Sequence, residues 1–190
     1  FRTANSSKKE IIPEGFKQII PKNTKINSIS LKDGLLKIDF SKELLNINAD
    51  LEEKMIESIV YSLTILDEVK NILIFVNGEL LTALNDGTIL PNPLNRNFGI
   101  NKVYDIEKIK NTTKVTIYYI SKYHDYYYYV PVTKISNEPG NKMEIIINEL
   151  KSSPVRETNL MSYLASNLEL LNYELLEQKI NLSFNKYLLD

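Results

Sequence analysis

The side chains that could act as acids, bases or nucleophiles are few in this sequence, and none forms a recognisable catalytic set. His124 is the sole histidine, and Asp125 beside it could in principle take part in a proton relay. In an extended chain, however, two neighbouring side chains point to opposite faces, and the sequence places no nucleophile near them. We therefore interpret His124 as an exposed turn residue. Cysteine is absent, which excludes thiolate catalysis and zinc–sulfur sites, and we expect no catalytic residue, no metal and no cofactor.

Tyrosine is the residue type whose distribution is least ordinary. The sequence has 12 tyrosines, and seven of them fall within residues 118–129. Because successive residues of a strand point to opposite faces, one core cannot bury them all. We expect Tyr119 to point inward with Ile117, and Tyr118 to point outward beside either of the pairs 126/128 and 127/129. Exposed rings suit contacts with proteins or glycans, whereas the alternative is a run of strand-forming residues in a tyrosine-rich protein. The candidate partner contacts are Tyr118, Tyr126, Tyr127, Tyr128 and Tyr129.

Composition and charge exclude several classes of protein. The 190 residues are 43% hydrophobic and 25% charged, as in a folded globular protein of one or two domains. The 23 basic and 24 acidic residues give a net charge of −1, so we expect no nucleic-acid partner. No apolar run is long enough to span a membrane. We interpret Glu52, Glu53 and Glu57 as solvent-exposed charges on a helix surface.

Two segments have the apolar spacing of amphipathic helices. The first covers residues 50–66, with Asp50 as its N-cap and Glu53 completing a capping box. The second covers 141–151, with Asn141 and Glu144 in the same roles. The expected apolar faces are Leu51, Met55, Ile56, Ile59, Val60 and Leu63 in the first helix, and Met143, Ile146, Ile147 and Leu150 in the second.

Alternating or continuous apolar runs, separated by turn residues, predict the strands. Asp33-Gly34 and Asn77-Gly78 are typical of tight hairpin turns. Residues 85–101 contain two prolines and are predicted to form a loop. The expected strands are 25–31, 36–40, 69–76, 79–84, 115–120 and 126–132.

Part of the beginning of the chain is repeated at its end. Residues 16–46 align without a gap on residues 160–190, at a constant offset of 144. The apolar positions match although the polar ones do not, which indicates one structural unit used twice. We therefore expect Ile38 and Leu182 to face a core, and likewise Phe40 and Phe184.

The repeat sets the expected domain organisation. We predict a tail or partial element over 1–15, a first unit over 16–101 and a linker over 102–114, followed by a second unit over 115–190. The first unit lacks the leading strand and helix of the second, and the second stops before its last helix and strand. We expect strand 115–120 and helix 141–151 to pack back onto the first unit. That packing would bring Ile59 or Leu63 against Met143 or Ile147 and cover apolar surface that a monomer would otherwise expose.

Several segments resemble the GerM domain of exported lipoproteins and sporulation or germination proteins of Gram-positive bacteria. They are KDGLLKIDFSKELLN at 32–46, the helix and hairpin that follow it, PLNRNFGIN at 93–101, TIYYI at 116–120 and VPVTK at 130–134. The tandem duplication also resembles that family. The resemblance implies a duplicated α+β fold of the ring-building type, with two helices on one face of a small mixed or antiparallel sheet.

The resemblance also implies a function by contact instead of catalysis. It implies a non-enzymatic assembly or scaffold role in the cell envelope or spore, on the outer face of the cytoplasmic membrane. The implied partners are ring-forming envelope proteins or copies of the same domain. Membrane attachment would need an N-terminal lipid anchor, and this sequence contains no lipid-accepting cysteine. The alternative is a cell-wall glycan or peptide binder that uses the tyrosine-rich strand.

Overall fold

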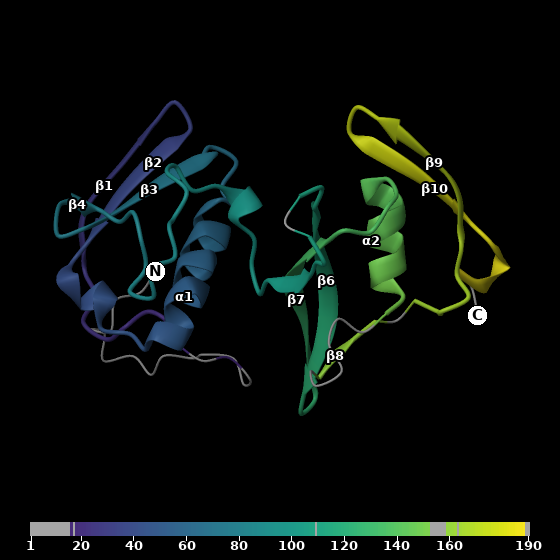
Figure 1. The fold of residues 1–190 in the computed structure, drawn as a ribbon, viewed down its shortest axis with the longest axis horizontal. Helices are drawn as coiled ribbons and strands as arrows, with labels where there is room; N and C mark the ends of the chain where they lie inside the picture. Colours follow the sequence, from purple (N-terminus) through teal and green to yellow (C-terminus); the bar gives the residue numbers. More distant parts are fainter. Residues whose placement is uncertain (1–15, 17, 109, 153–158, 163, 189–190) are drawn as a thin grey trace. The chain divides into compact units, whose positions relative to one another are not determined.

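A computed structural model describes residues 16, 18–108, 110–152, 159–162 and 164–188 of the chain. The chain divides into two compact units, residues 1–100 and 101–190 (Figure 1). The described residues of each unit contain strands and one α-helix, so the predicted α+β class is confirmed. Within the described residues, no helix is both long and apolar enough to cross a membrane.

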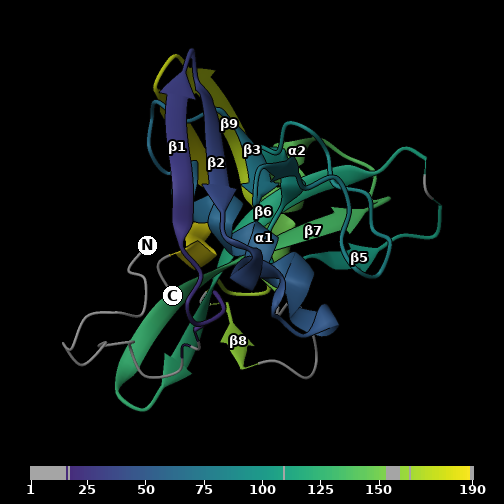
Figure 2. The same ribbon diagram turned by 90° about the vertical axis from the view of Figure 1, so that its left-hand side faces the viewer.

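The first unit is built on a four-stranded mixed sheet with the strand order β1-β2-β3-β4. Figure 2 shows its long hairpin β1–β2 in the foreground. The hairpin turns at Asp33 and Gly34, whose φ angles of 49° and 77° are accessible at low cost to Asp and Gly. β3 then pairs with β2 in parallel, and β4 pairs with β3 in antiparallel fashion. The strands are β1 (Ile26–Lys32), β2 (Leu35–Phe40), β3 (Asn71–Val76) and β4 (Glu79–Leu80).

Helix α1 (Ala49–Leu63) makes the crossover from β2 to the parallel strand β3, preceded by the 3-10 helix η1 (Lys42–Leu45). Its apolar face packs with β2 and β3 into one core, as predicted for all of the expected residues except Leu51, which is exposed. The helix begins one residue earlier than predicted. The N-cap is Asn48, which makes no side-chain capping bond, so the predicted capping role of Asp50 is wrong.

Two of the three glutamates expected on the helix surface are buried instead. Glu52 and Glu57 are each only 2% exposed, and Glu53 is half-buried. The carboxylate of Glu52 accepts hydrogen bonds from the backbone N–H of Asn85 at 2.9 Å and from its side-chain amide at 3.2 Å. Glu52 therefore anchors the loop after β4 to the first turn of α1.

The loop that completes the first unit is also fixed by specific contacts. Its residues Leu84, Leu90 and Leu94 belong to the core. The guanidinium of Arg96, in the 3-10 helix η2 (Arg96–Phe98), lies 4.4 Å from the centre of the Tyr61 ring on α1. This cation–π contact holds the predicted loop against the helix.

The second unit contains a four-stranded mixed sheet with the order β5-β7-β6-β8. Helix α2 (Lys142–Leu150) packs on it through a core that includes Val115, Ile117 and Ile145. Asn141 caps the helix as predicted, accepting hydrogen bonds from the backbone N–H groups of Met143 and Glu144. The strands are β5 (Val103–Asp105), β6 (Thr113–Tyr123), β7 (Tyr126–Ser136) and β8 (Leu160–Met161).

One predicted boundary needs a correction. Part of the expected linker 102–114 is structure of the second unit, since β5 pairs in parallel with β7. The two helices expected on one face of a sheet lie one in each unit. The first unit buries the apolar sides of β2 and α1 in its own core, while Ile26, Ile29 and Leu31 of β1 stay exposed, so strand 115–120 and helix 141–151 are not needed to cover β2 and α1. That packing itself stays a prediction.

The repeat is present as a second hairpin, formed by β9 (Leu170–Leu176) and β10 (Lys179–Phe184) and followed by the 3-10 helix η3 (Lys186–Leu188). Its pairing copies that of β1–β2 at the offset of 144. Ile29 faces Ile38 in the first hairpin, as Tyr173 faces Leu182 in the second. The register shift beside the first pair of each hairpin is also shared. Only the burial differs: Ile38 is 1% exposed and Leu182 is 38% exposed, so the expectation that Leu182 faces a core is wrong.

This difference in burial makes a testable prediction about stability. Ile38→Ala removes fully buried methyl groups from the first core and should lower the free energy of unfolding by about 2–4 kcal/mol. The equivalent Leu182→Ala should cost less than about 1 kcal/mol, because water already reaches that side chain. Urea unfolding followed by circular dichroism measures both. Equal losses from the two substitutions would show that the hairpins have equivalent surroundings in solution.

Candidate functional site

The hairpin β6–β7 carries the tyrosine-rich segment, and its register decides which side chains share a face. Residues directly opposite in an antiparallel pair lie on the same side of the sheet. Tyr118 faces Pro131, Ile120 faces Tyr129 and Lys122 faces Tyr127. Alternation along each strand therefore places Tyr118, Tyr127 and Tyr129 on one face, which we call the outer face of the hairpin.

The outer face is open to solvent at its tyrosines, whereas Thr133 and Ile135, farther along the same face, are buried. The exposed fractions of Tyr118, Tyr127 and Tyr129 are 48%, 56% and 76%. Lys122 lies opposite Tyr127 on this face, with its ammonium 5.5 Å from the centre of the Tyr127 ring. The outward orientation expected for Tyr118 agrees with its exposure, and the pair 127/129 is the one beside it. Their role in binding a partner stays a prediction.

The other predicted pair lies on the opposite face, near the turn. Tyr126 is 59% exposed and Tyr128 is half-buried, with their ring centres 6.4 Å apart. These rings continue the face of Tyr119 past the end of α2, where the hairpin extends beyond its core. His124 occupies the turn with a φ of 53°, is exposed as expected, and lies against the ring of Tyr123. The candidate residues thus occupy both faces of the hairpin tip.

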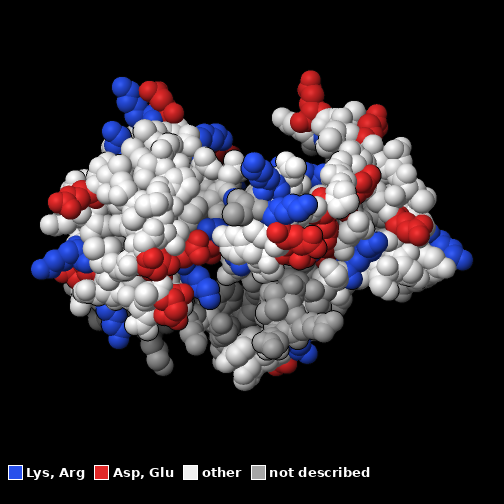
Figure 3. Space-filling model, viewed as in Figure 1, with Lys and Arg blue, Asp and Glu red and all other residues white. Residues whose placement is uncertain are grey.

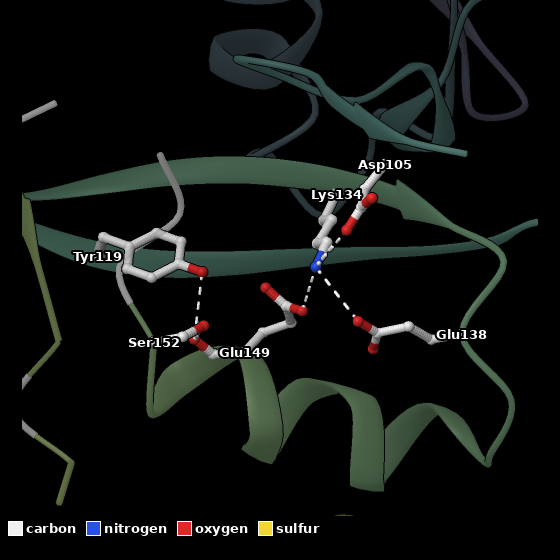
Figure 4. Close-up of polar contacts among 6 residues, drawn as sticks. All are labelled: Asp105, Tyr119, Lys134, Glu138, Glu149 and Ser152. Carbon is white, nitrogen blue, oxygen red and sulfur yellow. Dashed lines mark hydrogen bonds and ion pairs between the residues drawn. The ribbon is translucent and has the colours of Figure 1, made fainter. Parts of the chain in front are cut away.

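The inner face of the hairpin holds helix α2. Tyr119 is 2% exposed, as expected from its alternation with Ile117, which is also 2% exposed. Its hydroxyl donates a hydrogen bond of 3.2 Å to the backbone carbonyl of Glu149 in the last turn of α2 (Figure 4). The hydroxyl of Ser152 donates to the same carbonyl. Tyr119 therefore ties the C-terminal end of the helix to the strand that carries Tyr118.

A half-buried lysine supplies the second link between sheet and helix. Lys134 faces Val115 across the sheet, so it shares the inner face with the apolar core. Its ammonium contacts the carboxylate of Glu149 at 2.5 Å, that of Asp105 on β5 at 3.2 Å and that of Glu138 at 3.4 Å. These four residues, the Lys134 cluster, join α2, β5 and β7 (Figure 4). The sequence analysis did not identify Lys134 as a site residue. A single lysine at an inward-facing position of the strand segment VPVTKIS could have indicated that it pairs with buried carboxylates.

The environment of these groups shifts two pKa values. Burial raises the pKa of Tyr119 to about 12, and the nearby negative charge of Glu149 acts in the same direction. Burial alone would lower the pKa of Lys134. The hydrogen bonds to Glu149 and Asp105, with the charges of Glu149 and Glu138, outweigh burial and raise the pKa of Lys134 above its ordinary value. Lys134 is therefore held as a cation, which suits structural pairing and not proton transfer near neutral pH.

No group of three or more His, Cys, Asp or Glu side chains in the described part of the chain is arranged to hold a metal ion. The three carboxylates of the Lys134 cluster already surround a cation supplied by the protein itself. The candidate site is thus a hairpin with exposed tyrosines on its outer face. On its inner face, the hydrogen bond of Tyr119 and the Lys134 cluster attach it to α2 and β5. Such an arrangement offers an exposed aromatic contact surface.

The Lys134 cluster predicts a cost for removing its cation. Lys134→Met should lower the free energy of unfolding by about 3 kcal/mol, because Glu149 is left as a buried carboxylate without its counter-charge. Lys134→Met combined with Glu149→Leu should recover part of this loss. Urea unfolding measures both, with the exposed Lys122→Met as the matched control. If Lys134→Met alone were as stable as wild type, that would contradict the anchoring role of Lys134.

The raised pKa values predict alkaline destabilisation of the second unit. Groups whose pKa is raised on folding stabilise the protein below their unfolded pKa and lose that contribution as the pH rises through the folded value. For Tyr119 this window runs from pH 10 to about 12. Tyr119→Phe should lower the free energy of unfolding by about 1 kcal/mol at pH 7, because the hydrogen bond is lost. Between pH 10 and 12, the free energy of unfolding of this variant should fall less steeply than that of wild type. Tyr104→Phe, which alters an exposed ring, is the control. Equal slopes for Tyr119→Phe and wild type would contradict the assignment.

Comparison with known proteins shows what this chain is similar to. Residues 3–82 match the Germane family, described as "Sporulation and spore germination". The "Spore germination protein GerM" of Bacillus subtilis (strain 168) is 30% identical over 181 residues, which cover 93% of this chain and 50% of that protein. The chain thus spans half the length of this curated relative.

A solved structure extends the match to the fold. The tandem GerMN domains of the sporulation protein GerM from Bacillus subtilis superpose with a TM-score of 0.88 at 29% identity. The superposition covers 94% of this chain and 65% of that one. Both units are therefore matched, including the second, where the sequence resemblance was weaker. The family match over residues 3–82, the sequence identity and the shared tandem fold agree: the chain is similar to the Germane (GerM) proteins in both of its units.

Proposed function

We propose that this chain is a non-enzymatic assembly protein of sporulation or germination, which acts through protein contacts made by the outer face of the β6–β7 hairpin. The homology to a spore germination protein supports the process. The observation that carries the contact role is the group of exposed rings of Tyr118, Tyr127 and Tyr129 on one face of a single hairpin. We also propose that the protein works outside the cytoplasmic membrane, as the family resemblance implies.

The physical properties of the outer face favour protein contact. Tyrosine is enriched where interfaces gain most of their binding energy, because its ring buries a large area and loses little conformational entropy. The hairpin is attached to α2 and β5 by Tyr119 and by the Lys134 cluster, so the strands that carry the rings have a fixed base. A preorganised surface loses less entropy on binding than a mobile one.

The charge distribution fits a protein partner better than a polyanion. Acidic and basic side chains are interspersed over the face drawn in Figure 3, in keeping with the net charge of −1. Binding to nucleic acid depends on concentrated positive charge, which the sequence does not supply. We propose that the partners are copies of the same domain or related ring-forming domains of the envelope.

The rival is a binder of cell-wall glycans or peptides, because sugar rings also stack on exposed tyrosines. Both functions use the same rings, so a mutation alone does not separate them. The two functions are separated by what is bound. A protein partner buries the outer face against another protein surface, whereas a glycan occupies a few rings and leaves the protein monomeric.

The test combines self-association, glycan binding and stability in one set of variants. In the triple variant, Tyr118, Tyr127 and Tyr129 are all replaced by Ser, and Tyr104→Ser is the control because Tyr104 is 60% exposed on β5. We expect wild type and the control to self-associate with rising concentration in sedimentation velocity, and the triple variant to stay monomeric. Its melting temperature should stay within a few degrees of wild type, since exposed rings contribute little to the core.

Three outcomes would contradict the proposal. A collapse of the melting temperature in the triple variant would place these rings in the core. Binding of soluble muramyl fragments by a monomeric wild type, lost in the triple variant, would favour the glycan binder. If the wild-type protein neither self-associates nor binds muramyl fragments, the proposed contact function of the outer face is contradicted.

A further inference from the structure

Strand β7 has one edge that its sheet covers only in part. Along the other edge, β7 pairs with β6 over its whole length, down to Tyr126 beside the turn. On this edge, β5 pairs in parallel with residues 134–136 alone. In the part of the chain that the structure describes, no strand pairs with residues 126–130 on the β5 side. Figure 1 shows this part of the hairpin projecting past α2.

The backbone N–H and C=O groups of Tyr127 and Tyr129 point away from β6, along this edge. The C=O of Pro131 accepts a hydrogen bond of 2.9 Å from the side-chain amide of Asn101, which precedes β5, so it points to the β5 side. The N–H and C=O of one strand residue point the same way, and alternate residues repeat that direction. The missing N–H of Pro131 therefore breaks no bond to β6. The two-residue turn gives the same alternation, because its closing pair is hydrogen-bonded and Tyr126 thus faces β6.

The edge segment lacks the features that keep edge strands from pairing. Residues 126–130 have the sequence YYYYV, without charge or proline, whereas charged side chains, prolines or bulges commonly protect such edges. Tyr127 and Tyr129 on the outer face are 56% and 76% exposed, and Tyr126 on the inner face is 59% exposed. Rings therefore flank the edge on both faces of the hairpin. A contact made by the outer face alone does not explain the inner rings, whereas a strand added along the edge would contact both sets.

We infer that two copies of this chain pair through this edge, with residues 126–130 of each forming an antiparallel, two-fold contact centred on Tyr128. This inference rests on the proposed function, because it specifies how copies of the domain associate. In this register Tyr127 lies opposite Tyr129 of the partner subunit, and the two residues exchange both of their backbone hydrogen bonds. The two-fold axis repeats this pair on the other side of Tyr128.

The edge itself favours a second copy as the occupant. Its two outward-pointing residues, Tyr127 and Tyr129, lie symmetrically about Tyr128, so the segment is its own complement in an antiparallel pair. Opposed rings then form cross-strand aromatic pairs, and no like charges meet because the segment carries none. Pairing stops at Pro131, which has no N–H to donate and whose C=O is already bonded to Asn101. The contact therefore closes as a dimer, and its short length predicts a weak, concentration-dependent association.

Single engineered cysteines report on the register, because the chain contains no cysteine of its own. In a pair centred on residue 128, the two copies of that residue are non-hydrogen-bonded neighbours with Cα atoms about 4.5 Å apart, within reach of a disulfide. The two copies of residue 126 lie roughly 13 Å apart. Tyr128→Cys should therefore form a disulfide dimer with oxidised glutathione at least ten times faster than Tyr126→Cys. Random collision would favour Tyr126→Cys, since Tyr126 is exposed and Tyr128 is half-buried on the same face.

The wild-type chain supplies a second test that needs no substitution. Amide hydrogen exchange of the full isotope-labelled chain is measured by NMR in dilute and in concentrated solution. We expect the Tyr127 and Tyr129 amides to exchange about ten-fold more slowly in the concentrated sample, because they become hydrogen-bonded across the edge. The Tyr128 amide points to β6 in both states and should change less. If Tyr128→Cys does not fold, this measurement alone decides.

The outcomes separate this inference from the proposed function. Suppose that wild type associates in sedimentation velocity, while Tyr126→Cys cross-links as fast as Tyr128→Cys and the Tyr127 and Tyr129 amides keep their exchange rates. The copies then associate through another surface, which overturns the edge pairing and leaves the proposed function standing. A wild type that stays monomeric at the concentration of the NMR sample overturns both.

Discussion

The antiparallel register of β6 and β7 is the constraint on which the second unit depends. It pairs Thr113 with Ser136 at one end and Tyr123 with Tyr126 at the other, without a break. Once this register is set, every side chain of the hairpin has its face assigned. Tyr119 and Lys134 point to the helix and hold it, while Tyr118, Tyr127 and Tyr129 point away from it. The anchoring of α2 and the contact surface are therefore two consequences of one pairing.

Local chemistry made a large part of this fold predictable. Asp33-Gly34 and Asn77-Gly78 adopt positive φ angles and form the expected turns, because Asn, Asp and Gly tolerate this region. Asn141 caps α2, since its side chain reaches two backbone N–H groups of its own first turn. The alternation of Tyr118 and Tyr119 follows from the pleat of a strand. Each of these features depends on neighbours within a few residues, which a single sequence displays.

Features that depend on distant partners escaped prediction. Glu52 is buried because Asn85, 33 residues away, satisfies its carboxylate. Lys134 lies half-buried on the inner face because carboxylates of other elements, Glu149 and Asp105, pair with it. Residues 103–105 were expected to be linker, and they become a strand because β7 offers them an edge. Leu182 matches Ile38 in sequence and register, yet burial is decided by what packs against it, and this differs between the hairpins.

Residue-resolved hydroxyl-radical footprinting of the tyrosines, on the wild-type chain in dilute and in concentrated solution, tests the central claim most directly. If the outer face of β6–β7 is the contact surface, Tyr118, Tyr127 and Tyr129 should be modified readily in dilute protein and become protected on association. Tyr104 should react equally in both states, and the buried Tyr119 should react slowly in both. Protection of Tyr104 with no change at Tyr118, Tyr127 and Tyr129 would contradict the account.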